Sequence, residues 1–125
     1  MHNTVLSLSP LELDVMNIVW SLETCSIREV REELHKEKEL AYTTVATILS
    51  RLFDKGIVKR EEKNLVVYFS PKISREHYSK KVAGSFFKNF FNSFGDTAIA
   101  SFAESIDELP KAKKEHFLKL LEKRK

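Results

Sequence analysis

The chain has 125 residues, of which 42% are hydrophobic and 31% charged, and its net charge is +3. This length fits one domain, or one small domain with an appendage, and the apolar fraction is large enough to build a buried core. The sequence has no run of about 18 apolar residues, which argues against membrane insertion, and its N-terminus does not have the pattern of a secretory signal. Cys25 is the only cysteine, so an intrachain disulfide is excluded and a reducing compartment, the cytoplasm, is expected.

Charge is distributed unevenly along the chain. Residues 1–39 hold four Lys/Arg against eight Asp/Glu, residues 40–73 hold six against three, and residues 74–125 hold eleven against seven. A basic segment that follows an acidic one favours a polyanionic partner for the basic part.

Two serine–glutamate pairs predict the starts of the first two helices. Ser9 and Glu12 have the spacing of a capping box with a proline in the first turn, and Ser26 and Glu29 repeat that spacing. The apolar side chains expected to face the core are Leu13, Met16, Val19 and Trp20 in the first helix and Ile27, Val30 and Leu34 in the second. Trp20 is expected to supply buried area rather than a platform for a ligand.

The stretch from Leu40 to Gly56 predicts a third helix with two contrasting faces. Its apolar side chains recur at helical spacing, and they are Val45, Ile48, Leu49, Leu52 and Phe53. The opposite face carries short hydroxyls and a guanidinium, and its residues are Thr43, Thr44, Thr47, Ser50, Arg51 and Asp54. Such groups reach phosphates and base edges when a helix lies in the major groove. We interpret this face as a DNA-reading surface, with an ordinary solvated face as the alternative.

Two β-type runs follow the glycine that is expected to cap the end of the third helix. They span residues 57–61 and 65–69, around a polar turn at residues 62–64. Helices followed by a hairpin are the order of a winged helix, in which the second and third helices form a helix-turn-helix. Lys63 and Asn64 at the tip are expected to donate to phosphate or reach the minor groove, or else to form a simple soluble turn.

The remaining chain is expected to form a helical arm that joins two copies of the protein. Ser74 can cap a long helix, Gly95 restarts a second helix and Pro110 begins a third. The residues expected in the dimer core are Phe86, Phe87, Phe90, Phe91, Phe94, Phe102, Phe117, Leu118 and Leu121. The first five lie within nine residues, which is more rings than one slim helix can bury against a small winged helix, and leaving several exposed promotes aggregation. We therefore predict an intersubunit core, with an intrachain core among the arm helices as the alternative.

The predicted fold class is mainly α with a small β-hairpin wing. A winged helix-turn-helix domain is expected in residues 1–73 and a three-helix dimerisation domain in residues 74–125. The four histidines have no zinc-ligand spacing with Cys25, and the sequence has no glycine-rich phosphate loop. We predict no enzyme, no metal and no cofactor. Cys25 is expected to be a small buried residue at a short strand, with a redox sensor as the alternative.

Four blocks in the first 71 residues carry a family signature. They are LSPLELDVMNIVW, IREVREEL, AYTTVATILSRLFDKGIVKRE and VVYFSP. In this order and spacing they resemble the penicillinase-repressor (BlaI/MecI-like) family of winged-helix transcription regulators, whereas the C-terminal part is similar only in the layout of its helices.

The resemblance implies a homodimeric repressor that binds an inverted-repeat operator in double-stranded DNA, with the helix at residues 42–55 in the major groove. Matched position by position, the DNA-binding residues are Thr43, Thr44, Ala46, Thr47 and Arg51 on that helix and Lys63 and Asn64 near the wing tip. It also implies that a membrane sensor-protease system releases the repressor by cutting the arm between Ser101 and Phe102.

Two other functions remain open at this point. One is a winged-helix regulator that encloses a small molecule between the aromatic arm and the core. The other is a winged helix that serves as a protein-interaction scaffold.

Overall fold

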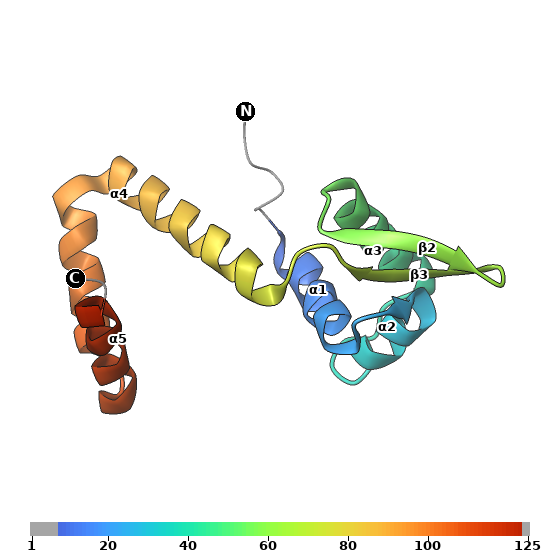
Figure 1. Ribbon diagram of the computed structural model, residues 1–125, viewed down its shortest axis with the longest axis horizontal. Helices are drawn as coiled ribbons and strands as arrows, with labels where there is room; N and C mark the ends of the chain where they lie inside the picture. The colour runs from blue at the N-terminus through green and yellow to red at the C-terminus, as the bar shows by residue number, and fades with distance from the viewer. Residues whose placement is uncertain (1–7, 124–125) are drawn as a thin grey trace. The chain divides into compact units, whose positions relative to one another are not determined.

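The computed structural model describes residues 8–123 of the chain (Figure 1). The elements are α1 (Pro10–Leu22), β1 (Cys25–Ser26), α2 (Ile27–Leu34), α3 (Tyr42–Asp54), β2 (Val58–Lys63), β3 (Val66–Pro71), α4 (Arg75–Asp107) and α5 (Lys111–Lys123). They form two compact units, the first ending at Ala83 and the second beginning at Gly84. The first turns of α4 therefore belong to the first unit, where Tyr78 is buried in the core.

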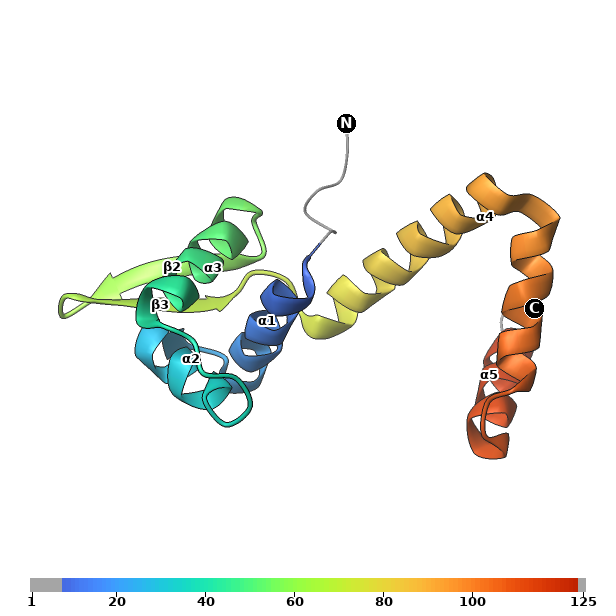
Figure 2. The ribbon, with the colours of Figure 1, turned by 180° about the vertical axis from the view of Figure 1, so that it is seen from behind.

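The first unit is a winged helix, which confirms the predicted fold class. Its three helices pack with a three-stranded antiparallel sheet of order β1-β3-β2. Cys25 pairs with Phe69 across β1 and β3, and Lys63 pairs with Val66 at the far end of β2 and β3. The β2–β3 hairpin projects beyond the helices as a wing (Figures 1 and 2).

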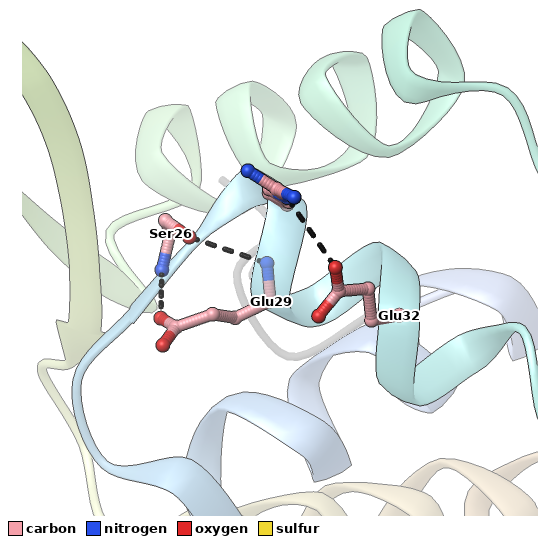
Figure 3. A network of polar contacts seen from close by, with 4 residues as sticks. Ser26, Glu29 and Glu32 are labelled. Carbon is pink, nitrogen blue, oxygen red and sulfur yellow. Dashed lines mark hydrogen bonds and ion pairs between the residues drawn. The ribbon is translucent and has the colours of Figure 1, made fainter.

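Both predicted capping boxes are present. The Ser9 amide donates to the Glu12 carboxylate at 2.9 Å while the Glu12 amide donates to the Ser9 hydroxyl at 3.1 Å. The same reciprocal pair joins Ser26 and Glu29 at 2.8 and 3.2 Å (Figure 3). Each box satisfies amide groups that the first helical turn leaves without a partner, so the starts of α1 and α2 are fixed by local sequence.

Buried aliphatic side chains from all three helices form the core, with two corrections to the predicted stripes. The α1 residues that it buries are Glu12, Val15, Met16 and Val19. Leu13 is 38% exposed because the stripe passes through Glu12 instead, a position that hydrophobic periodicity does not select. Phe53 is 36% exposed because it lies at the edge of the α3 stripe, where the Arg60 guanidinium covers its ring at 4.1 Å.

Trp20 has the predicted packing role. Its indole NH donates to the Ile73 carbonyl at 2.9 Å, and its ring lies 5.5 Å from that of Tyr78. The side chain thereby joins α1 to the segment that leads into α4.

Two contacts anchor the connection between α2 and α3, one at its middle and one near its end. Lys38 forms an ion pair with Asp14 of α1 at 2.7 Å, and the Arg31 guanidinium donates to the Leu40 carbonyl at 2.9 Å. At its C-terminus, α3 ends in a Schellman motif, in which the Ile57 amide donates to the Leu52 carbonyl at 3.0 Å and Gly56 has a φ of 78°. The predicted glycine cap is thus confirmed.

The turn of the hairpin differs from the prediction. Residues 62 and 63 continue β2, and the chain reverses at Asn64 and Leu65, whose φ angles are 53° and 66°. Two consecutive positive φ angles are the signature of the primed two-residue turns that match the twist of a hairpin. The sequence prediction counted polar residues, whereas this turn type is defined by backbone conformation.

The second unit contains the kinked end of the arm. α4 bends at Gly95, where φ is 60° and ψ is −137°, and α5 lies beside the segment of α4 that follows the kink (Figures 1 and 2). The Phe102 ring packs against Phe87 at 4.8 Å and Phe117 at 6.1 Å between ring centroids. Lys114 of α5 forms a hydrogen-bonded ion pair with Asp107 of α4. This interaction holds the pKa of the Asp107 carboxyl below its usual value.

Several apolar side chains of this unit are not covered within one chain. Phe86 and Phe94 are 58% and 61% exposed, and Leu118 and Leu121 are about half exposed. The arm therefore has an intrachain aromatic cluster around Phe102 and, in addition, an uncovered apolar surface. Within residues 8–123, no helix combines the length and apolar character needed to cross a membrane.

Candidate nucleic-acid interface

The outer face of α3 presents hydroxyl groups to solvent. Its exposed residues are Thr43, Thr44, Thr47, Ser50 and Arg51, opposite the buried side chains of Val45, Ile48, Leu49 and Leu52. The burial of one face thus fixes the orientation of the other, as the sequence pattern predicted. Polar side chains with this exposure can reach phosphates or base edges without moving the helix.

Thr47 has a defined hydrogen-bonding state on this face. Its hydroxyl donates to the Thr43 carbonyl one turn earlier at 2.9 Å, so its proton is used within the helix. The oxygen lone pairs remain available, and the side chain can accept a hydrogen bond from an exocyclic amino group of adenine or cytosine. Its methyl group can contact the methyl group of a thymine.

The N-terminus of α3 is built differently from those of α1 and α2. Its N-cap residue is Ala41, which supplies no side-chain hydrogen bond, whereas the other two helices begin with complete capping boxes. The first-turn amides of α3 therefore have no side-chain acceptor at the cap. The amides of such a helix end can donate hydrogen bonds to a phosphate oxygen.

Arg51 lies on the flank of α3 that faces α1. It acts electrostatically on Glu12, whose carboxylate accepts a hydrogen bond from Lys55 at 2.8 Å. Burial alone would raise the pKa of Glu12, but the bond from Lys55, the amide of Ser9 and the charge of Arg51 together hold this pKa below its usual value. The carboxylate is therefore charged in the folded protein and ties the end of α3 to the start of α1.

Ala46 lies on the opposite flank, toward the wing, rather than at the centre of the outer face. It is partly buried and lines a hollow of about 410 Å³ with Ser50, Arg60 and Glu62. Arg60 of β2 lines this hollow while its guanidinium lies over the Phe53 ring, a position that the sequence analysis missed. Alternation along the strand was the available signal, because Arg60 and Glu62 are two residues apart and share a face.

The wing tip carries the two predicted polar residues and one unforeseen apolar residue. Lys63 and Asn64 are exposed, as expected, and Leu65 is 92% exposed. Leu65 shares a hollow of about 680 Å³ with Tyr42, the first residue of α3, and Arg28 near the start of α2. Arg28 is another missed cation, and its guanidinium contacts Glu32 at 3.3 Å (Figure 3).

Cys25 lies in the core of the first unit and has the properties of a structural residue. It is fully buried in β1, with its sulfur 3.8 Å from the Phe69 carbonyl. Burial, together with the charge of Glu29, raises the pKa of the thiol to about 11, so the reactive thiolate is scarce at neutral pH. Among the described residues, no group of His, Cys, Asp and Glu side chains is arranged to hold a metal ion.

The two residues of the predicted cleavage site lie in the second unit. Ser101 is exposed and Phe102 is half-buried, and both are in the helical segment after the kink of α4. The predicted cleavage bond therefore lies within helical backbone, next to the ring at the centre of the aromatic cluster.

Comparison with known proteins identifies relatives along nearly the whole chain. The family model described as penicillinase repressor matches residues 8–123. The penicillinase repressor of Staphylococcus aureus is 30% identical over 105 residues, which cover 84% of this chain and 83% of that protein.

Two solved structures share the fold of the first unit. One is the DNA-binding domain of the repressor BlaI, with 30% identity, a TM-score of 0.53, and coverage of 59% of this chain and 90% of that one. The other is the monomeric form of Bacillus licheniformis BlaI in complex with the blaP half-operator, with 30% identity, a TM-score of 0.50, and coverage of 58% and 88%. The winged helix, its exposed hydroxyl-bearing α3 and the match over residues 8–123 together show that this chain belongs to the penicillinase-repressor family of transcriptional repressors.

Proposed function

We propose that this protein is a homodimeric transcriptional repressor that binds an inverted-repeat operator through α3 of each copy. The observation that carries the proposal is the exposed row of hydroxyls on α3 beside a projecting wing. A helix placed in the major groove brings such side chains to base edges. The comparison that supports it is the solved complex of the monomeric form of Bacillus licheniformis BlaI with the blaP half-operator.

The side chains of the interface have different roles in this proposal. Thr43, Thr44 and Thr47 read base edges, and Arg51 binds a phosphate or a guanine from the α1 flank of the helix. The remaining contacts come from Ala46, which meets the groove wall on the wing side, and from Lys63 and Asn64 at the wing, which bind the sugar–phosphate backbone.

The uncovered apolar surface of the arm supports a second copy of the chain as its partner. Phe86 and Phe94 are more than half exposed in one chain, and burying a phenylalanine stabilises a protein by roughly 1.5 to 3 kcal/mol. Two winged helices joined in one body bind two half-sites with a single loss of translational freedom, which raises the affinity for a paired operator. The operator is then an inverted repeat, because its symmetry follows that of the dimer.

Release of the operator would act on the arm rather than on α3. Cleavage between Ser101 and Phe102 would separate α5 from most of α4 and divide the aromatic cluster in which Phe102 contacts Phe87 and Phe117. The agent proposed is a membrane sensor-protease system, with the repressor itself in the cytoplasm. Mass spectrometry of the chain after incubation with an activated sensor tests the proposed cleavage. An intact chain would contradict it.

A selection experiment with alanine variants tests the reading role of α3. The full chain first selects duplexes from a random pool, and its affinity is then measured for the selected duplex and for a random duplex. Thr44→Ala and Thr47→Ala should each lower the preference for the selected duplex by about 0.5 to 1.5 kcal/mol, because each removes a single hydrogen bond or methyl contact to a base. Lys63→Ala should weaken binding to both duplexes alike. It should also reduce the slope of log affinity against log salt by about 1, the amount expected for one lost phosphate contact.

Equal losses on both duplexes for the threonine variants would contradict base reading by α3. A weak dependence of binding on salt would instead favour the protein-interaction scaffold, because an operator complex releases counterions and weakens steeply as salt rises.

A further inference from the structure

Leu65 stands out on the surface of the first unit. It is 92% exposed at the tip of the wing, although leucine is an apolar side chain that usually lies in a core. Its neighbours Tyr42 and Val66 are also substantially exposed and line the same hollow. These three side chains form an apolar patch that extends from the wing tip to the start of α3.

The backbone of Leu65 is also unusual. Its φ of 66° lies in the left-handed region, which glycine and asparagine adopt far more readily than leucine. The preceding residue, Asn64, is well suited to its own φ of 53°, and glycine is the common second residue of such a turn. Leucine is therefore not explained by the turn, and backbone strain of this kind gathers at functional positions.

The location of Leu65 indicates what it can contact. Lys63 and Asn64, the proposed contacts to the sugar–phosphate backbone, immediately precede it, and Tyr42, which also lines the hollow, is adjacent to Thr43 on the proposed reading helix. The patch is thus continuous with the proposed DNA interface. The hollow is also bordered by Arg28, whose side chain is 82% exposed.

We propose that Leu65 is an apolar DNA contact that enters the minor groove beside each half-site and packs against the deoxyribose faces. The inference rests on the proposed function and adds a contact of a different chemical kind. The walls of the minor groove are sugar rings, and apolar side chains that enter it contact these rings and the edges of base steps. Because leucine carries no charge, this contact adds affinity without releasing counterions.

Four variants of the full chain test the proposal on a duplex selected from a random pool by the unmodified protein. Leu65→Gly removes the side chain and suits the positive φ, and Leu65→Asn keeps a similar size, tolerates the same φ and is polar. Both should lower the affinity about tenfold per half-site without changing the slope of affinity against salt. Leu65→Met keeps an apolar side chain and should bind within about twofold of the unmodified protein.

Leu22→Asn is the matched control, because Leu22 is a partly exposed leucine at the end of α1, outside the hollow that contains Leu65. It should leave DNA affinity unchanged. Thermal unfolding should show that Leu65→Gly is at least as stable as the unmodified chain, so that a loss of affinity is not a loss of folding.

The proposal is overturned if Leu65→Gly or Leu65→Asn binds as tightly as the unmodified protein, if Leu65→Met loses as much affinity as Leu65→Gly, or if the loss comes with a smaller salt slope. In each of these cases the unmodified protein still binds its selected duplex, so the repressor function stands. If the unmodified protein selects no duplex, the proposed function itself has failed.

Discussion

Glu12 shows how a single side chain connects the core to α3, the proposed reading helix. It occupies a buried position on α1, completes the capping box with Ser9 and accepts a hydrogen bond from Lys55 just after the end of α3. The sequence predicted the capping role from spacing, but not the burial, since a carboxylate is not selected by a search for apolar periodicity. Apolar periodicity selects Leu13 for the core in its place. The pairing with Lys55, 43 residues away in sequence, together with the Ser9 amide and the charge of Arg51, makes burial of the charge acceptable.

Replacing Glu12 by glutamine should destabilise the protein in a pH-dependent way. The folded-state pKa of Glu12 is lowered, so its charged form contributes stability that is present above about pH 4.5 and is lost as pH falls through the folded-state pKa. Glu12→Gln should lower the free energy of unfolding by about 1.5 to 3 kcal/mol at pH 7, because the bond to Lys55 loses its charge. Urea unfolding at pH 7 and pH 3 should show this difference shrinking at the lower pH.

Glu29→Gln is the control for the capping interaction, because Glu29 makes the same box at an exposed helix start. It should have a smaller effect at pH 7. An equal loss for both variants, unchanged between the two pH values, would mean that the charge of Glu12 has no special role.

Among the elements, α4 is shaped by one glycine. Gly95 combines a φ of 60° with a ψ of −137°, a conformation essentially restricted to glycine, and it lets the chain turn from the first part of α4 to the segment that packs with α5. Gly84, in contrast, lies in regular helix. A side chain at either position would meet no atom within 4 Å, so any effect of substitution comes from the backbone and not from a clash.

Alanine at these two glycines should therefore have opposite effects. Gly95→Ala should lower the free energy of unfolding of the full chain by about 1 to 3 kcal/mol, because it opposes the kink. Gly84→Ala should raise it by about 0.5 to 1 kcal/mol, because alanine is the better helix former. Urea unfolding followed by circular dichroism measures both, and a neutral or stabilising Gly95→Ala would show that the kink is not required.

The wing shows where element prediction from sequence reaches its limit. Its strands were predicted from β-branched and aromatic residues, and both formed in the structure. The turn was misplaced by one to two residues because Asn64 and Leu65, rather than the charged residues before them, adopt positive φ. The cation of Arg60 over Phe53 and the position of Arg28 beside Tyr42 depend on contacts between elements, which no local pattern contains.

At the scale of the whole molecule, the proposed repressor combines a reading surface on α3 with an arm that joins two copies. The winged helix could be predicted almost completely, since its caps, buried stripes and helix-ending glycine are local signals. The arm could be predicted only in outline, because its phenylalanines are compatible with both an intrachain cluster and an intersubunit core. One chain contains the cluster around Phe102 and still leaves Phe94 and Leu118 uncovered, so the partner of this surface is the central question.

The molar mass of the full chain in solution tests this most directly. Light scattering at micromolar concentration should give about twice 14.5 kDa for the unmodified protein, because an uncovered surface of this kind favours association with a second copy. Phe94→Ser should shift the mass toward that of one chain, whereas Leu22→Ser, a change at a partly exposed leucine outside the arm, should not. A single chain of 14.5 kDa at micromolar concentration, bound to its selected duplex as one copy, would contradict the account.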